Sequence, residues 1–317
     1  MKRLIGIDIG GTKIAVVKGD DHGKIEQKIR FENDGTPAQM IDRILSAVKD
    51  MGDADAIGIS CGGPLDAERG LILSPPNLPG WNEIPIVSFL EKATGIPAYL
   101  QNDADACALA EWKHGAGRGT ENMIFLTFGT GLGAGLILNG RLYAGSSGSA
   151  GEIGHIAMEK DGPIGYGKRG SLEGFCSGGG IRQIAIAKAE SQFAKGCVPS
   201  FCENSDKLES ITAKIVADCA NKGHEDAIEI YKECGYMLGR GLAILIDLLN
   251  PQRIVIGSIY ARSHALLEDS MIQALKKEAL PAALANCHIL PAALGEALGD
   301  IAALSVAQNG LERRIGQ

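Results

Sequence analysis

Two glycine-rich turns carry groups that could bind phosphate. The first, Asp8-Ile9-Gly10-Gly11-Thr12-Lys13, lies between two apolar segments and offers closely spaced backbone N–H groups, a hydroxyl and a carboxylate. Backbone N–H groups of this kind can cradle phosphate, and a nearby carboxylate is a suitable place for Mg²⁺. A plain hairpin turn is an equally good interpretation, because Gly-Gly is itself a favourable hairpin sequence.

The second turn runs from Gly129 to Gly135 and fits the GxGxx(G/A) spacing of dinucleotide-binding proteins, with Glu152 at about the right distance beyond it. That fingerprint requires a helix after the turn, whereas "GLILNGRLYAG" predicts a strand, an Asn-Gly turn and a strand. We therefore interpret Gly129, Thr130 and Gly131 as a second phosphate loop. Two such loops, one in each half, are expected to face each other across a cleft.

Asn102 and Asp103 lie where a predicted strand ends and a predicted helix begins. Both residue types are preferred at helix N-termini whatever the chemistry of the protein, so a capping role is sufficient to explain them. The positive end of the helix would also hold the Asp103 carboxylate ionised, as a general base requires.

The elements that must position these residues alternate along the chain and then repeat. The first half predicts strands at residues 3–10, 13–20, 24–31, 56–61 and 97–101, and helices at 37–51, 86–95 and 103–115. Residues 123–145 repeat the opening pattern of strand, glycine turn and strand. The remainder predicts long helices between about 180 and 250, strands at 253–257 and near 287–290, and helices at 263–280 and 298–312.

The composition is that of a globular protein with room for two cores: 317 residues, 45% of them hydrophobic and 22% charged. The formal net charge of −7 provides no basic field to attract nucleic acid or an anionic membrane. No apolar segment reaches the roughly 20 residues that a membrane-spanning helix needs. The eight cysteines form no CxxC pair and the N-terminus does not read as a signal sequence, so we expect a reduced, cytoplasmic protein.

Five motifs together resemble the ROK family of sugar kinases and sugar-responsive repressors, within the actin-like ATPase superfamily. They are "DIGGTK", "SPPNLPGW", "NDADA", "FGTGLGAG" and "GEIGH", and the resemblance runs from about residue 3 to 310. It implies an α/β fold of duplicated ribonuclease-H-like domains, with two lobes around a cleft that binds ATP. We expect a small N-terminal lobe at 1–114, with helix 297–313 packing back on it, and a larger lobe at 115–296.

The resemblance also implies roles for individual residues. Asp103 matches the catalytic base of the family, and Asp8 would lie near the Mg²⁺ that accompanies ATP. The sugar would be bound by Asn77, Asn102, Asp103, Glu152, His155 and Glu173, and ATP by Asp8, Gly10, Gly11, Thr12, Lys13, Gly129, Thr130, Gly131 and Gly257. For Asn77 a turn role is equally good. For Gly178–Gly180 a helix start is as good an interpretation as ATP contact.

One departure from the family pattern concerns zinc. In many ROK proteins the histidine equivalent to His155 binds zinc together with three cysteines of a CxCGxxGC loop. Here Ile164, Tyr166 and Ser171 occupy those cysteine positions. A tetrahedral structural zinc needs four ligands, and Cys176 nearby would still leave two to find, so we expect no zinc. We expect the loop to keep its path through packing of Ile164 and Tyr166, and to deliver His155 and Glu173 to the sugar.

The resulting hypothesis is an ATP-dependent kinase of glucose or a related hexose or N-acetylhexosamine, with sugar and ATP as partners. The alternative is a sugar-responsive regulator without catalysis. Repressors of the family carry an N-terminal helix-turn-helix, and because the phosphate loop begins at Asp8 we expect none here. An actin-like ATPase acting on a protein or on another small acid would leave Asn102, Glu152, His155 and Glu173 unexplained. Members of the family often form dimers, so a homodimer is also compatible with the resemblance.

Overall fold

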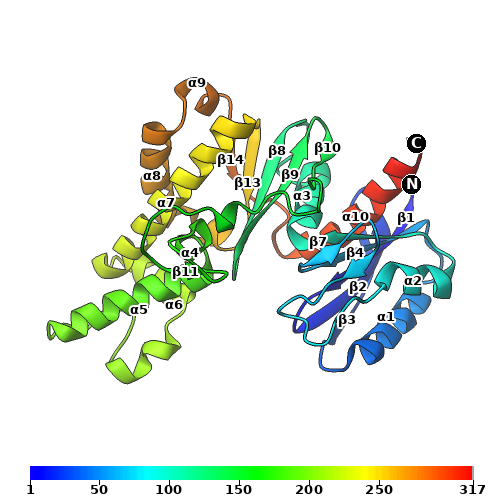
Figure 1. Cartoon of the computed structure of the whole chain (residues 1–317), viewed down its shortest axis with the longest axis horizontal. Coiled ribbons are helices and arrows are strands. Elements are labelled where there is room, and N and C mark those ends of the chain that lie inside the picture. The colour runs from blue at the N-terminus through cyan, green and yellow to red at the C-terminus, as the bar shows by residue number, and fades with distance from the viewer. Residues whose placement is uncertain (316–317) are drawn as a thin grey trace. The chain divides into compact units, whose positions relative to one another are not determined.

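The computed structural model describes residues 1–315, which form two compact units. The first unit comprises residues 1–121, 135–150 and the segment from Ala293 onward. The second comprises residues 122–134 and 151–292. The chain therefore passes between the units four times, and each unit has its own sheet core and its own helices (Figure 1).

The first unit is built on a five-stranded sheet with the order β3-β2-β1-β4-β7. Its antiparallel part is the meander β1 (Arg3–Ile9), β2 (Lys13–Asp20) and β3 (Ile25–Glu32), and its parallel part adds β4 (Ala56–Cys61) and β7 (Ala98–Asn102) to β1. The helices are α1 (Pro37–Met51), α2 (Ile86–Thr94), α3 (Asp103–His114) and α10 (Leu298–Ile315), and the short strands are β5 (Leu65–Asp66), β6 (Leu71–Ile72) and β10 (Arg141–Leu142).

Helix α1 shows how local sequence sets these boundaries. Thr36 accepts a hydrogen bond from the backbone of Gln39, and the Gln39 side chain accepts one from the backbone of Thr36, so a capping box begins the helix. Gly52, at a φ of 71°, ends it. The apolar positions recur at helical spacing and are buried against the sheet: Met40, Ile41, Ile44, Ala47, Val48 and Met51.

The two faces of β1 pack against different helices. Ile5, Ile7 and Ile9 join the core that includes α1, whereas Leu4 packs with residues of α10. Gly6 faces α10 as well, and a Cβ there would lie 2.8 Å from the Cβ of Ala303. A side chain at this position would push the helix away, so glycine allows α10 to lie directly on the strands (Figure 1).

The second sheet repeats the order of the first: β10-β9-β8-β13-β14. Its members in the second unit are β8 (Met123–Phe128), the start of β9 (Leu132–Leu138), β13 (Arg253–Ile256) and β14 (His288–Pro291). As in the first sheet, two strands add in parallel to the first strand of a meander, because β13 pairs with β8 and with β14 in parallel. The internal repeat predicted from the sequence is therefore present in the strand order.

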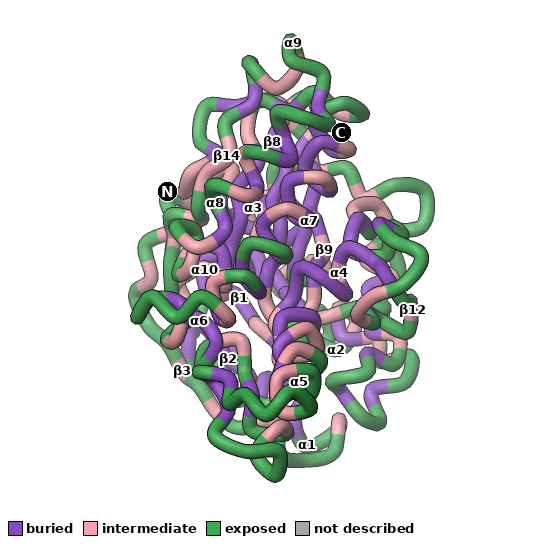
Figure 2. The backbone as a smooth tube through the Cα atoms, turned by 90° about the vertical axis from the view of Figure 1, so that its left-hand side faces the viewer, coloured by how far each residue is buried: buried purple, intermediate pink, exposed green. Residues whose placement is uncertain are grey.

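Helices dominate the rest of the second unit: α4 (Leu172–Phe175), α5 (Gly178–Ala194), α6 (Ala213–Asn221), α7 (Glu225–Leu249), α8 (Ile259–Glu278) and α9 (Pro281–Leu284). Helix α7 is largely buried (Figure 2) and packs on α8 at Gly235 and Gly239. Cβ atoms there would lie 2.4 and 2.3 Å from carbonyl oxygens of α8. Helix α8 begins four residues before its predicted start, and its helical geometry breaks at Ser263, the predicted first residue.

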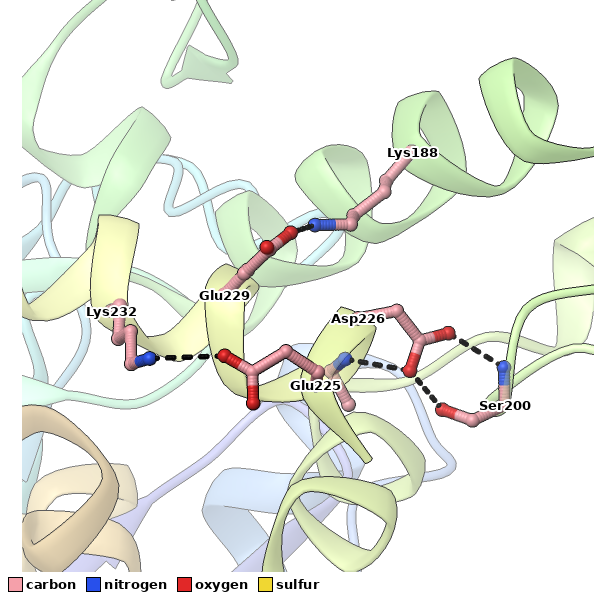
Figure 3. Close-up of polar contacts among 7 residues, drawn as sticks. Lys188, Ser200, Glu225, Asp226, Glu229 and Lys232 are labelled. Carbon is pink, nitrogen blue, oxygen red and sulfur yellow. Dashed lines mark hydrogen bonds and ion pairs between the residues drawn. The ribbon is translucent and has the colours of Figure 1, made fainter. Parts of the chain in front are cut away.

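Polar contacts tie α7 to neighbouring segments (Figure 3). Lys188 of α5 pairs with Glu229, and both the N–H and the hydroxyl of Ser200 donate to the Asp226 carboxylate at 2.7 Å. These contacts fix the N-terminal half of α7 beside α5. None of the helices in the described part of the chain is long and apolar enough to cross a membrane.

Candidate active site

In the first unit, the predicted site residues lie at one edge of the sheet. Strands β1, β4 and β7 are parallel, and their register aligns Ile9 with Cys61 and Cys61 with Asn102. The carboxyl ends of parallel strands meet at the same edge, so the turn after Ile9 and the pair Asn102–Asp103 are brought together. The strands were predicted from the sequence, but only their register shows that the turn after Ile9 lies beside Asn102 and Asp103.

The turn after β1 is held by its own backbone and by an asparagine. The N–H of Gly10 donates to the carbonyl of Lys13 at 3.0 Å. The Asn33 side chain donates to the Gly10 carbonyl at 2.9 Å, and the Asn33 N–H donates to the Thr12 carbonyl at 2.8 Å. Asn33 was not predicted as a site residue, although it directly follows β3, whose last residue, Glu32, pairs with Lys13.

Asn77 packs against this turn. A Cβ on Gly11 would lie 2.6 Å from the backbone oxygen of Asn77, and a Cβ on Gly62 would lie 3.4 Å from its side-chain amide. Asn77 is exposed and sits in a turn closed by a bond from the Leu78 N–H to the Pro75 carbonyl at 2.9 Å. Asn77 therefore forms part of a turn and also lies beside the glycine turn that follows Asp8.

The side chains of Asn102 and Asp103 both accept hydrogen bonds from backbone N–H groups at the start of α3. The Asn102 side-chain oxygen accepts the Asp105 N–H at 2.7 Å, and one oxygen of Asp103 accepts the Ala104 N–H at 2.9 Å. The capping interpretation is therefore correct for Asn102. Each bond occupies one side-chain oxygen, which leaves the amide NH₂ of Asn102 and the second oxygen of Asp103 as groups that a ligand could engage.

Burial and neighbouring carboxylates raise the pKa of Asp8 to about 6. Burial is the largest cause, followed by Asp300 and Asp103, while Lys28 and Arg30 lower the pKa in part. Lys28 also forms an ion pair with Asp300, with 2.5 Å between Nζ and Oδ2. Asp8 and Asp103 therefore share one electrostatic environment in the first unit.

The pKa of Asp103 is raised as well, again by burial. The backbone N–H of Ala104 lowers it, as the sequence predicted for a helix N-terminus, but burial outweighs that effect. The expectation that the helix end would hold Asp103 ionised was thus incomplete. The Asp103 side chain is exposed to solvent, so water moderates the increase in its pKa.

In the second unit, three segments meet at the turn after β8. The Gly129 N–H donates to the Gly131 carbonyl at 3.0 Å, and the Gly178 N–H, at the start of α5, donates to the Gly129 carbonyl at 2.8 Å. A Cβ on Gly129 would lie 3.7 Å from the hydroxyl oxygen of Ser258. Ser177 caps α5, so the helix-start interpretation of Gly178–Gly180 is correct, and the same residues also lie beside the glycine turn.

Ser258 adopts a backbone conformation that favours glycine, with φ 54° and ψ −112°. It follows Gly257, where a Cβ would lie 3.0 Å from the ring of Phe125. The backbone at Ser258 is therefore one that glycine adopts without strain, although the residue is a serine.

Glu173 lies against the same glycine turn. Its carboxylate accepts the Leu132 N–H at 3.0 Å, and a Cβ on Gly131 would lie 2.7 Å from that carboxylate oxygen. Glu152 and His155 are exposed at the two ends of a single 3₁₀ turn, in which the His155 N–H donates to the Glu152 carbonyl at 3.1 Å. A Cβ on Gly154, within that turn, would lie 3.3 Å from the Cβ of Glu173, so the three predicted sugar ligands of this unit are neighbours.

The loop that lacks the cysteines is not held as predicted. Ile164 is 43% exposed and Tyr166 is 75% exposed, so the expectation that packing of these two side chains holds the loop was wrong. The loop forms a hairpin of β11 (Ile164–Gly165) and β12 (Lys168–Arg169). Side-chain bonds to its backbone and to the His155 carbonyl hold it instead.

Cys176 lies in the core, away from any zinc-type ligand set. It is fully buried, its thiol donates to the Cys234 carbonyl at 3.4 Å, and burial raises its pKa well above the usual range for a thiol. Zinc binds the thiolate, which burial disfavours here. All eight cysteines are free, and within residues 1–315 no group of three or more His, Cys, Asp or Glu side chains is arranged to hold a metal.

Comparison with known proteins assigns the family. The ROK family profile matches residues 4–309. The chain belongs to the ROK family. It is 30% identical to the glucokinase of Thermotoga maritima over 99% of this chain and 98% of that protein. It is 33% identical to the N-acetylmannosamine kinase of Citrobacter koseri over 80% of this chain and 82% of that protein. A xylose repressor of Bacillus spizizenii is 26% identical over 92% of this chain and 73% of that protein.

Solved ROK structures share the fold. The ROK glucokinase of Streptomyces griseus, in complex with glucose and AMPPNP, matches with a TM-score of 0.76 and 30% identity over 97% of this chain and all of that chain. The predicted fold class is therefore confirmed: an α/β protein with the duplicated units of the actin-like ATPase superfamily.

Proposed function

We propose that this protein is an ATP-dependent sugar kinase that phosphorylates glucose or a related hexose or N-acetylhexosamine. One observation carries the proposal: at the carboxyl edge of the first sheet, the glycine turn after Asp8, the amide of Asn77 and the Asp103 carboxylate occur together. A phosphate-type turn beside a carboxylate is the pair of groups that phosphoryl transfer to a hydroxyl requires. The glucokinase and N-acetylmannosamine kinase relatives support the same class of activity.

In this proposal Asp103 is the general base. Its free carboxylate oxygen accepts the proton of the acceptor hydroxyl, and Asn102 orients the sugar through its free amide NH₂. A raised pKa makes Asp103 a stronger proton acceptor than an ordinary aspartate. Asn77, Glu152, His155 and Glu173 are the further sugar-binding residues of the proposal.

The chain also has residues suited to Mg·ATP. Mg²⁺ bound to a nucleotide usually takes one or two protein carboxylates and completes its shell with water and phosphate, so Asp8 alone is a sufficient protein contribution. When bound, the ion neutralises charge on the phosphoryl oxygens. The backbone of Gly10–Thr12, with Lys13, would hold phosphate in the first unit, and Gly129–Gly131 with Gly257 in the second.

We propose that the protein works without zinc. His155 is exposed, Cys176 is buried with its thiol on a carbonyl, and the three remaining positions of the loop carry no ligand. We also propose that the protein acts in the cytoplasm, that it has no nucleic-acid or membrane partner, and that it can form a homodimer as other members of the family do.

The proposal is tested by ADP release from Mg·ATP with glucose, fructose, mannose, allose, N-acetylglucosamine and N-acetylmannosamine. We expect turnover that depends on one of these sugars. Sugar binding without turnover across the whole panel would contradict the kinase and favour a sugar-responsive regulator. ATP hydrolysis at the same rate with and without each sugar would contradict sugar-dependent phosphoryl transfer.

A further inference from the structure

The hairpin at residues 164–169 is completed by a glutamine from a helix. The Ile164 N–H donates to the side-chain oxygen of Gln183 at 2.9 Å, and the Gln183 side-chain nitrogen donates to the Ile164 carbonyl at 2.8 Å. Ile164 pairs with Arg169 in the two-stranded ladder. The neighbouring residues Pro163 and Gly170 are joined by a hydrogen bond, from the Gly170 N–H to the Pro163 carbonyl at 2.8 Å. Both backbone groups of Ile164 thus point away from the partner strand, and the Gln183 amide satisfies both.

A second bond joins the same hairpin to the turn that carries His155. The Lys168 ammonium donates to the His155 carbonyl at 2.7 Å. Together, Gln183 and Lys168 connect the hairpin to helix α5 on one side and to the Glu152–His155 turn on the other.

The hairpin in turn packs directly on Glu173. A Cβ on Gly165 would lie 2.8 Å from the Cβ of Glu173 and 2.5 Å from the Gly174 nitrogen. Ser171 caps the short helix α4 that carries Glu173, and its hydroxyl would lie 2.8 Å from the same Gly165 Cβ. Movement of the hairpin would therefore displace Glu173, because no space separates the two segments.

We propose that Gln183 is a positioning residue for sugar binding: with Lys168, it holds the hairpin so that His155 and Glu173 keep their places without a metal ion. The inference rests on the proposed function, since it assigns these two residues to the sugar. The apolar side chains of the hairpin do not provide this support by packing in the core, because Ile164 is 43% and Tyr166 75% exposed. Tyr166 and Gly167, at φ 42° and 77°, form the two-residue turn of the hairpin.

Two variants separate the two bonds between Gln183 and Ile164, and a third is a control. Gln183→Met keeps the length of the side chain and removes both bonds. Gln183→Glu keeps an acceptor for the Ile164 N–H but cannot donate to the Ile164 carbonyl. Ser191→Ala, at an exposed position of the same helix, is the matched control.

The first measurement is hydrogen–deuterium exchange of the peptide that covers residues 160–170, in the full-length protein without sugar. We expect exchange in Gln183→Met to be about 10-fold faster than in the parent protein, because two neutral hydrogen bonds of ordinary strength are lost. We expect an intermediate rate in Gln183→Glu and no change in Ser191→Ala. Unchanged exchange in Gln183→Met would overturn the proposal, whatever the protein catalyses.

The second measurement is steady-state kinetics with the sugar that the parent protein phosphorylates, or the dissociation constant for glucose if it phosphorylates none. We expect KM for the sugar, or that dissociation constant, to rise about 10-fold in Gln183→Met and less in Gln183→Glu, with KM for ATP unchanged. Equal losses for sugar and ATP would indicate general damage to the unit and would overturn the positioning role. Absence of turnover in the parent protein would count against the proposed function alone, since hydrogen–deuterium exchange and glucose binding still test whether Gln183 holds the hairpin.

Discussion

Replacement of Asp8 by asparagine is expected to make the protein more stable and less active. A carboxyl group whose pKa is higher in the folded than in the unfolded chain binds its proton more tightly in the folded state. The free energy of unfolding therefore falls as the pH rises from about 4 to about 6, and the full penalty applies above pH 6. Asparagine is neutral at every pH, so Asp8→Asn removes the penalty.

The magnitude follows from the pKa of Asp8, which rises from 3.8 to about 6 on folding. A difference of roughly two pH units, at about 1.4 kcal/mol each, corresponds to about 3 kcal/mol at pH 8. At pH 5 the unfolded chain is still mostly ionised and the folded one mostly protonated, so the expected gain is about half as large.

Urea denaturation at pH 8 and pH 5, with EDTA present, measures this difference. Both tryptophans of the chain, Trp81 and Trp112, lie in the first unit with Asp8, so tryptophan fluorescence reports the unfolding of that unit. We expect the midpoint of Asp8→Asn to exceed that of the parent protein, and by more at pH 8 than at pH 5.

Asp20→Asn is the matched control with the opposite sign. Burial opposes its ionisation, but the N–H groups of Lys24 and His22 donate to the Asp20 carboxylate at 3.1 and 2.9 Å, and the pKa of Asp20 is lowered. This variant should therefore lose stability at pH 8. A decrease in stability for Asp8→Asn at pH 8, or a gain equal at both pH values, would refute the electrostatic reasoning.

Three further predictions concern the turns and the metal. Gly11→Ala should reduce kcat/KM for both substrates at least about 10-fold, because its Cβ would lie 2.6 Å from the Asn77 backbone oxygen. Gly62→Ala should be tolerated, because its Cβ would lie 3.4 Å from the Asn77 side chain. Steady-state assays in which Gly62→Ala loses more activity than Gly11→Ala would contradict this contact. Ser258→Gly should raise the free energy of unfolding by roughly 1 kcal/mol by relieving the backbone strain at φ 54°, as measured by denaturation, and a loss of stability would show that the conformation is unstrained. Protein purified without added metal should contain substoichiometric zinc by mass spectrometry of the metal, and its activity should survive a zinc chelator in excess Mg²⁺; one zinc per chain would contradict the metal-free hairpin.

The fold was predictable because each element carries its own local signal. The predicted helix at 37–51 and strand at 56–61 match α1 and β4 residue for residue, since hydrophobic spacing, a capping box and glycine or turn residues mark their ends. The start of α8 was less predictable, because Ser258 holds a glycine-type conformation and the helix then breaks at Ser263. The sequence shows no breaker residue at either position.

The candidate site was predictable where residues lie next to a turn or a strand end, and unpredictable where distant segments meet. The side-chain amide of Gln183 binds the backbone of Ile164, 19 positions away, and no sequence pattern links the two residues. The pKa of Asp8 depends on burial and on Asp300, which is brought beside it only by folding. Ile164 was predicted to pack because it is apolar, but apolarity does not reveal exposure at a hairpin edge.

The most direct test of the account compares Asp103→Asn with the parent protein, using the best sugar of the panel. Asparagine preserves the shape of the side chain and its bond from the Ala104 N–H but cannot accept the proton of a hydroxyl. We expect kcat to fall about 10²- to 10⁴-fold, while the dissociation constant for the sugar changes by less than about 10-fold. Full activity in Asp103→Asn would contradict the role of Asp103 as general base, and with it the central claim.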